Sequence, residues 1–131
     1  MPSSLIEVRR EYPEVQELAL IDAVHDSLVA AFRIPSEDRH VRLVVHAPHR
    51  MQTSPELADP SRYTLVTIDC FAGRSLEAKR ALYAQIVARL AAQGIPRDHV
   101  TIVLREHPTE NWGIRGGQAA CDVELGFTVT V

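Results

Sequence analysis

The chain has 131 residues, the usual size of one compact domain, and its 46% hydrophobic residues are enough to build one core. We therefore expect a single domain over residues 1–131. The 14 basic and 17 acidic residues are interspersed and leave a formal net charge of −3, so no basic stripe is available to neutralise a phosphate backbone. This charge pattern excludes nucleic acid as an expected partner.

The sequence also lacks the signals of secretion and membrane insertion. Its N-terminus has no positively charged head followed by an apolar run, and no stretch approaches the roughly 20 apolar residues that span a bilayer. We expect a soluble cytoplasmic protein with no membrane partner. Cys70 and Cys121 are far apart and form no C-x-x-C pair, so we interpret both as reduced structural thiols.

The first half of the chain, residues 1–60, has the pattern of a βαβ unit. A strand is predicted at Leu5–Val8 and a second, rich in Val and Leu, at Val41–Val45, after an Ile34-Pro35 turn. Between them, spacings of three and four indicate a helix with one apolar stripe, formed by Leu18, Ile21, Val24, Leu28 and Phe32. The proline-rich segment 47–62 then connects the two halves.

The second half, residues 61–131, repeats this order around an Ile95-Pro96 turn. Strands are predicted at Tyr63–Ile68 and Val100–Leu104, and the helix between them has its stripe at Leu82, Tyr83, Ile86, Val87 and Leu90. Ser75 is well placed as the N-cap of this helix, and Gly94 followed by proline supplies a stop. The chain therefore uses one unit twice.

These elements predict an α/β (α+β) fold in which two tandem βαβ units form a four-stranded core sheet with two helices on one face. Beyond them, apolar residues alternate with mostly polar ones through Val123, Leu125, Phe127, Val129 and Val131, which predicts an additional C-terminal strand. That strand and the sheet edges need partners, so we expect a homo-oligomer.

Two βαβ units with a proline directly after the initiator methionine resemble the tautomerase superfamily, most closely its malonate semialdehyde decarboxylase-like branch. The segments that carry the resemblance are MPSSLIEV at the start, LIDAVHDSLVAAFRIPSEDRH, GRSLEAKRALY, and ENWGIRGGQA near the end. The resemblance implies a tautomerase-like fold, usually trimeric, and an N-terminal proline that acts as acid or base on small keto, enol or unsaturated carboxylic acids.

Pro2 is the first candidate catalytic residue. If Met1 is trimmed, its nitrogen becomes a free secondary amine, and a free α-amino group has a reference pKa of about 7.7–8.0. Burial in an apolar pocket or a neighbouring cation would lower that pKa towards neutrality, the useful range for general acid-base work. A proline at the second position of an arbitrary protein is usually accidental, so the catalytic interpretation rests on the resemblance as well.

Arg74 is the candidate substrate-binding residue. It lies between the end of a strand and Ser75 at the start of a helix, where unpaired N–H groups favour an anion and a guanidinium can grip a carboxylate by two bonds. In the resembling enzymes the arginine of this Gly-Arg-Ser-type turn binds substrate. We expect Pro2 and Arg74 to converge on one pocket, because equivalent strands of the two repeats should lie side by side.

Four further residues are candidates for the same site. Asp38 follows the Ile-Pro turn, and the resemblance implies that an aspartate at this spacing assists the proline or orients a water. Arg39 and His40 beside it are possible pocket residues, although a polar turn running into a strand explains them equally well. Trp112, the only tryptophan, is most simply a packing residue that walls the pocket.

The sequence predicts neither a metal site nor a cofactor. His46 and His49 are separated by Pro48 and have no evident third ligand. Gly113, Gly116 and Gly117 do not have the spacing of a dinucleotide fingerprint, and we interpret them as a loop before the last strand.

Three functions remain open from the sequence. The first is a tautomerase in which Pro2 moves a proton between carbon and oxygen of a small 2-keto acid. The second is a decarboxylase or hydratase of a malonate-semialdehyde-like acid, with a cationic Pro2 stabilised by Asp38; Ala72 weakens it, because the resembling decarboxylase has an arginine there. The third is a non-catalytic trimeric binding protein, which retention of Met1 would favour.

Overall fold

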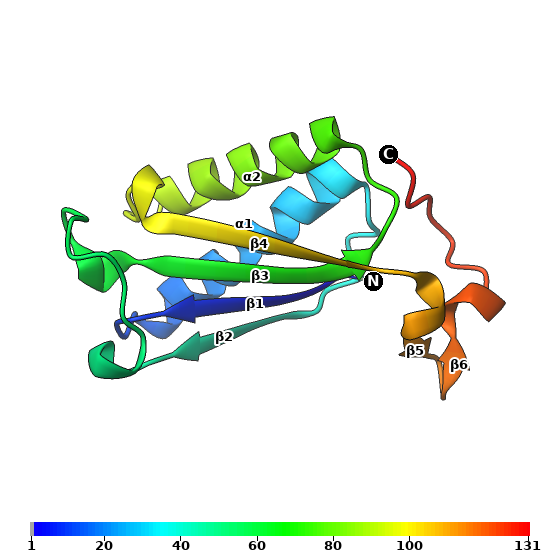
Figure 1. The fold of residues 1–131 in the computed structure, drawn as a ribbon, viewed down its shortest axis with the longest axis horizontal. Coiled ribbons are helices and arrows are strands. Elements are labelled where there is room, and N and C mark those ends of the chain that lie inside the picture. The colour runs from blue at the N-terminus through cyan, green and yellow to red at the C-terminus, as the bar shows by residue number, and fades with distance from the viewer. Residues whose placement is uncertain (1) are drawn as a thin grey trace.

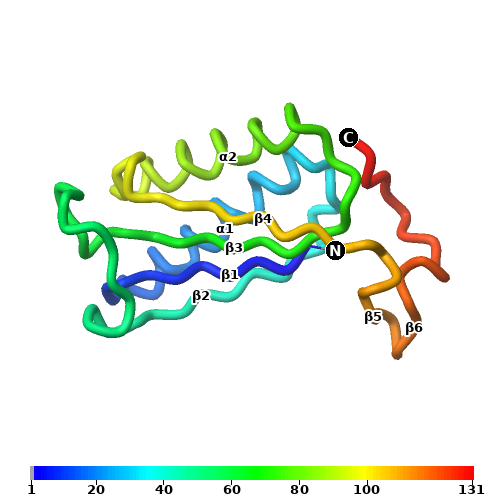
Figure 2. Tube along the Cα trace, viewed as in Figure 1, coloured from blue at the N-terminus to red at the C-terminus, as the bar shows by residue number. Residues whose placement is uncertain are grey.

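The computed structural model describes residues 2–131, so Met1, whose removal the proline hypothesis requires, lies outside the described residues. In chain order the main elements are β1 (Ser3–Val8), α1 (Glu14–Phe32), β2 (Val41–Val45), β3 (Thr64–Phe71), α2 (Leu76–Ala91) and β4 (Val100–His107). The sheet order is β2-β1-β3-β4, with each unit's own strands parallel and β1 antiparallel to β3. Both helices lie on one face of this sheet (Figures 1 and 2). The predicted pair of βαβ units is thereby confirmed.

Local sequence signals explain where each helix begins and ends. Helix α1 follows Pro13, carries two glutamates in its first turn, and ends at Arg33 in the left-handed conformation, φ 55°. Helix α2 starts at Ser75, whose Oγ accepts a hydrogen bond from the backbone N of Ala78 at 3.1 Å. In residues 2–131 neither helix combines the length and the apolar character that crossing a bilayer requires.

The main core lies between the helices and the sheet. Alternate residues of the two central strands point into it, and the helices contribute their predicted stripes; its fully buried side chains include Ile6, Val8, Leu20, Val24, Leu28, Phe32, Val66, Ile68, Leu82, Ile86 and Leu90. Among residues 2–131, no layer covers the other face of the sheet. Val44 and Val103 on that face are 39% and 43% exposed, which leaves apolar surface available to a partner.

The predicted C-terminal strand is wrong for the described chain, because residues 123–131 make no strand there. The alternation itself is real: Val123, Leu125, Phe127 and Val129 pack against a second small core around Phe71, Ile114 and Ala120. Period-two patterning reports one half-buried face of an extended segment, and it does not require a ladder of backbone hydrogen bonds.

The predicted glycine-rich loop is also more ordered than expected. Gly113–Ile114 (β5) and Gln118–Ala119 (β6) pair as a short antiparallel hairpin. Arg115, Gly116 and Gly117 form its turn with φ of 49°, 84° and 94°, a region that glycine enters at little cost. The hairpin packs Ile114 into the second core.

Replacing Ser75 with Ala should lower the free energy of unfolding by about 1 kcal/mol, because the first turn of α2 loses its side-chain cap. Ser75→Asp should retain most of the stability, since a carboxylate caps the same N–H group. Urea denaturation at matched protein concentration measures both. A Ser75→Ala midpoint equal to that of the unmodified protein would contradict the capping role.

Candidate active site

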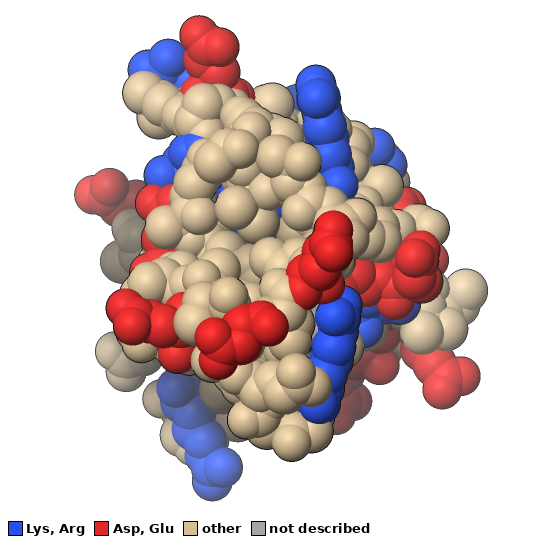
Figure 3. Space-filling model, turned by 90° about the vertical axis from the view of Figure 1, so that its right-hand side faces the viewer, with Lys and Arg blue, Asp and Glu red and all other residues tan. Residues whose placement is uncertain are grey.

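A pocket of about 280 Å³ lies at one end of the sheet, and its walls include Pro2, Ser3, His40, Trp112 and Ile114. Pro2 itself is buried. This end also carries the β5–β6 hairpin and the C-terminal segment (Figure 1). Seen from this side, the surface is largely uncharged in its centre, with acidic and basic side chains spread around it (Figure 3).

The fold fixes the pocket walls from three directions. Pro2 directly precedes β1, and the backbone N of Ser4 donates to the carbonyl of His40 at 2.9 Å, which holds the turn before β2 against this strand. Trp112 comes from the loop after β4, where its ring meets that of Phe71 edge-on at 5.1 Å and that of His107 at 5.7 Å. These contacts give the tryptophan a defined orientation.

Asp38 lies next to this pocket through His40. The Oδ1 atom of Asp38 is 3.3 Å from Nε2 of His40, and the aspartate side chain is only 12% exposed whereas that of His40 is 59% exposed. Asp38 also lines an adjoining cavity with Arg115, Leu125 and Phe127. The structure thus brings Asp38 to the pocket through the accessible imidazole of His40.

Arg39 does not join the site. Its Nη1 donates to Oδ1 of Asp22 on α1 at 2.8 Å, and both side chains are substantially exposed. Arg39 therefore contacts α1 from the polar turn and does not line the Pro2 pocket.

Arg74 is buried behind the site and does not line the Pro2 pocket, contrary to the expected convergence. Its Nη1 donates to the carbonyl of Phe71 at 3.1 Å and its guanidinium lies 4.8 Å from the centre of the Phe32 ring. Burial lowers the pKa of Arg74 from its usual value. Within residues 2–131 its Nε and Nη2 are buried without a hydrogen-bond partner, an unusual state for a guanidinium.

The C-terminal segment covers the turn that carries Arg74. Both the backbone N and the Oγ of Ser75 lie within hydrogen-bond distance of the Val131 carbonyl, at 3.4 and 2.9 Å. A Cβ on Gly73 would come within 3.2 Å of the Val129 carbonyl, so the segment approaches this turn closely. The main-chain oxygen of Val131 thus occupies the helix N-terminus where the sequence predicted a substrate carboxylate.

Arg42 is a candidate that the sequence analysis missed. Its Nη1 donates to Oγ of Ser3 at 3.1 Å, which places a guanidinium beside the pocket wall. The alternation of β2 indicates that Arg42 faces away from the helices, but only the strand register, with Arg42 opposite Leu5, brings it to Ser3. One sequence does not determine that register.

Neither cysteine belongs to the pocket, in agreement with a structural role. Burial raises the pKa of Cys70 to about 11, against the opposing effect of Arg74. Such a thiol is not a nucleophile near neutral pH. Among residues 2–131, no three His, Cys, Asp or Glu side chains are grouped so that they could hold a metal ion.

Comparison with known proteins identifies the family. The model of the tautomerase enzyme family matches residues 38–115, more than half of the chain. The chain belongs to the tautomerase family. The probable tautomerase RSp0893 of Ralstonia nicotianae is 36% identical over 53 residues, which cover 40% of this chain and 76% of that protein.

Solved structures of similar proteins place this tautomerase in the same fold. The FG41 malonate semialdehyde decarboxylase inhibited by 3-bromopropiolate is 28% identical, with a TM-score of 0.79 over 89% of this chain and 92% of that one. A second malonate semialdehyde decarboxylase is 25% identical with the same TM-score, over 93% and 99% of the two chains. A fused 4-OT, a symmetric trimer, is 24% identical, with a TM-score of 0.80 over 90% of this chain and 95% of that one. At this level of identity the comparison shows a common fold alone.

A charged group supports the tryptophan wall of the tautomerase pocket from the open face of the sheet. Asp69 lies 2.8 Å from Nε2 of His107 and 2.9 Å from Nε of Arg105. Burial acts to raise the pKa of Asp69, but the hydrogen bonds from His107 and Arg105 outweigh it and hold the pKa below its usual value. Asp69 therefore fixes the ring of His107, against which Trp112 packs.

Because its folded-state pKa is depressed, ionised Asp69 stabilises the fold above about pH 4, the ordinary aspartate value, and this contribution disappears as the pH falls through the lower folded-state pKa. Replacing Asp69 with Asn should therefore cost unfolding free energy at pH 7, and the difference from the unmodified protein should shrink below about pH 4. Urea unfolding at several pH values measures this. Asp26→Asn, at an exposed position on α1, is the control and should show no such trend.

Proposed function

We propose that this member of the tautomerase family catalyses keto–enol isomerisation of a small 2-keto carboxylic acid, with Pro2, freed by removal of Met1, as general acid and base. The observation that carries the proposal is the burial of Pro2 in the wall of a pocket beside Trp112 and Ile114. Apolar walls disfavour a charged amine and would lower its pKa towards neutrality. The neutral amine would then accept a proton from carbon, and the resulting ammonium would return one to oxygen or carbon.

This reaction moves protons and transfers no electrons to or from a partner, so the proposal includes neither cofactor nor metal. The pocket volume of about 280 Å³ suits a small acid. In this proposal His40, which lines the pocket and pairs with Asp38, exchanges a proton with the carbonyl oxygen of such a substrate. We therefore retain Pro2 as the catalytic residue, with Asp38 acting through His40.

We assign the substrate carboxylate to arginine. Arg74 has two nitrogens without hydrogen-bond partners among the described residues, and Arg42 supplies a second cation at Ser3. Contact between substrate and Arg74 requires the C-terminal segment to move from the turn at Gly73. A second cation at Arg42 would compensate for Ala72, where the resembling decarboxylase has arginine.

We also propose that the active protein is a cytoplasmic homotrimer. The uncovered face of the sheet presents Val44 and Val103 to solvent, and such surface is favourable to bury against a second copy. The similar fused 4-OT is a symmetric trimer. Subunit contacts would complete the pocket wall, whose lining in one chain leaves His40 well exposed.

Decarboxylation or hydration of a malonate-semialdehyde-like acid is a second candidate function. Two malonate semialdehyde decarboxylases are among the similar structures, and the sheltered carboxylate of Asp38 would favour a cationic Pro2. The two functions need opposite charge states of Pro2. The pKa of its nitrogen, measured by ¹⁵N NMR, separates them: a value near or below 7 supports the tautomerase, and a value above 8 supports the decarboxylase.

The proline hypothesis predicts covalent labelling of Pro2 by 2-oxo-3-pentynoate. This compound inactivates Pt0534, a protein of similar structure. Intact mass should show loss of Met1 and a single adduct, and peptide mapping should place the adduct on the N-terminal peptide. Retained Met1 with no adduct would instead support a non-catalytic binding protein.

Pro2 and Arg74 should have separable kinetic roles. Pro2→Ala should lower kcat in the conversion of phenylenolpyruvate by about 10²-fold or more, because the amine changes shape and solvation. Arg74→Ala should raise KM by about one to two decades, the loss of a charged hydrogen-bonded contact. Both effects are followed by absorbance.

The matched control is Arg80→Ala, which removes an exposed arginine of α2 outside the pocket and should leave both constants unchanged. If Pro2→Ala and the unmodified protein convert the substrate at the same rate as buffer alone, the proposed function is wrong. If Arg74→Ala leaves KM unchanged while Pro2→Ala is impaired, only the carboxylate assignment fails.

A further inference from the structure

The end of the sheet opposite Pro2 carries a second pocket, of about 570 Å³. It is lined on one side by Arg9, Arg10 and Glu11, which follow β1, and on the other by residues at and after the end of β2, Val45, Ala47 and Pro48. None of these residues belongs to the Pro2 pocket. A volume of this size is typical of small-molecule sites.

The internal repeat explains why a pocket exists at this end. The Pro2 pocket combines the start of β1 with the loop that follows β4, the second strand of the other unit. The second pocket combines Ser61, just before β3, with the loop that follows β2. Because β1 and β3 are antiparallel, these equivalent combinations lie at opposite ends of the sheet, as Figure 1 shows. The repeat therefore builds a second pocket beside the start of β3. There the residues before the strand belong to the connector, whereas the residue before β1 is Pro2.

The second pocket carries two arginines that no carboxylate of residues 2–131 pairs with. Arg9 donates through Nη1 to the carbonyl of Pro60 at 2.6 Å and through Nη2 to that of Pro48 at 3.2 Å, while its buried Nε has no partner among the described residues. Arg10 lies with its guanidinium 5.5 Å from the centre of the Tyr12 ring. Neutral carbonyls and an aromatic face are thus the direct contacts of these two guanidinium groups.

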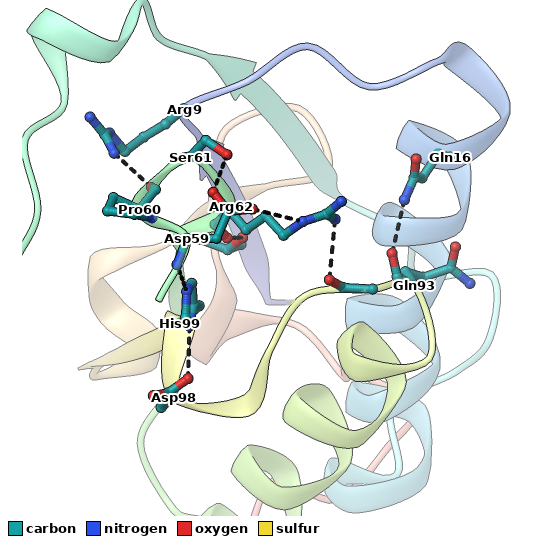
Figure 4. Close-up of polar contacts among 11 residues, drawn as sticks. Arg9, Gln16, Asp59, Pro60, Ser61, Arg62, Gln93, Asp98 and His99 are labelled. Carbon is teal, nitrogen blue, oxygen red and sulfur yellow. Dashed lines mark hydrogen bonds and ion pairs between the residues drawn. The ribbon is translucent and has the colours of Figure 1, made fainter. Parts of the chain in front are cut away.

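The carboxylates near the second pocket have direct partners of their own, with one exception, although the charge of Asp59 also acts on Arg10. Asp59 accepts a hydrogen bond from Ser61 at 2.6 Å and lies 3.2 Å from Nε of Arg62 (Figure 4). Glu7 lies 2.9 Å from Nε2 of His46. Glu11, exposed at the rim, is the lining carboxylate that opposes the arginines.

The wall that contains Ser61 is held rigidly. The backbone N of Asp59 donates to Nε2 of the buried His99 at 3.1 Å, and Nδ1 of that ring lies 2.7 Å from Asp98. Arg62 donates to the carbonyl of Gly94 at 3.1 Å (Figure 4). A site whose walls are fixed before binding loses less entropy when a ligand enters.

We propose that this second pocket binds a small carboxylate with an apolar body. Arg10 and Arg9 supply the positive charge that attracts the carboxylate, and Val45, Ala47 and Pro48 contact the apolar part of the ligand. The proposal does not depend on Pro2 chemistry, since no residue is shared between the two pockets. It gives one chain two acid-binding sites, of which only the first has a titratable proline.

Benzoate is the probe, and the experiment is a titration of the ¹⁵N-labelled, full-length protein in its native assembly. The backbone amides of Val45, His46 and Ala47 report on the second pocket, and the indole N–H of Trp112 reports on the Pro2 pocket. We expect benzoate to cause saturable chemical-shift changes at the amides of Val45, His46 and Ala47. These changes should persist when Pro2 is blocked by 2-oxo-3-pentynoate. Inorganic phosphate, titrated in parallel, should bind more weakly because it has no apolar body.

Two variants of opposite sign test the charge argument. Arg10→Ala should weaken benzoate binding at the second pocket about tenfold, whereas Glu11→Gln should strengthen it by about twofold to fivefold. Arg50→Ala, an exposed arginine after β2 that does not line the pocket, is the matched control and should leave the dissociation constant unchanged. Glu11→Gln keeps the test valid if Arg10→Ala fails to fold.

Each contrary outcome overturns the proposal. Absence of saturable shifts at Val45–Ala47 would mean that nothing of this chemistry binds there, including the case in which a neighbouring subunit covers the pocket. Equal weakening by Arg10→Ala and Arg50→Ala would indicate general attraction of anions to the protein. Phosphate binding as tight as benzoate would remove the role of the apolar wall. In all three cases Pro2 labelling would be unaffected.

Discussion

The antiparallel pairing of β1 with β3 is the contact on which the rest of the structure depends. It runs from Ser3 opposite Asp69 to Val8 opposite Thr64 and is the seam between the two βαβ units. Without it, each unit would be a two-stranded sheet with one helix, too small to bury a core. With it, both helices share one face, and the start of each unit lies against the strand ends of the other, which is where both pockets form.

At the Pro2 end of the β1–β3 pairing, a second small core continues the packing beyond the end of the sheet. Phe71, the last residue of β3, is fully buried although the strand ends there, because Trp112, Ile114 and the C-terminal segment pack around it. Trp112 and Ile114 also wall the pocket, whereas Phe71 and the C-terminal segment contact Arg74 and the turn that carries it. Moving the segment that covers Gly73 would open part of the second core, so a change at this turn would also affect stability.

The sequence predicted the elements well, because each carries local signals. The helical stripes end at the Ile34-Pro35 turn and at Gly94 with Pro96, and apolar runs mark the strands. The site was less predictable. Pro2, His40 and Trp112 do meet at one pocket, but Arg39 turns to Asp22 and Arg74 turns inward, and side-chain direction at a turn depends on neighbours distant in sequence. The alternation of apolar residues in the C-terminal segment correctly indicated one buried face, but the strand predicted from it is absent from residues 123–131. A hydrogen-bonded partner strand cannot be inferred from the spacing of apolar residues alone.

The two ends of the repeat also show why the chemistry would belong to one of them. A proline nitrogen titrates only when no residue precedes it, and in the second unit β3 follows the connector at Ser61 and Arg62, whose nitrogens are peptide-bonded. That end consequently has no amine to move protons, whatever it binds. It retains the pocket shape that the fold produces, and its arginines supply fixed positive charge. Under the proposed function, one architecture used twice would thus provide a site for proton transfer and a site for binding, and the difference would lie in what precedes each unit's first strand.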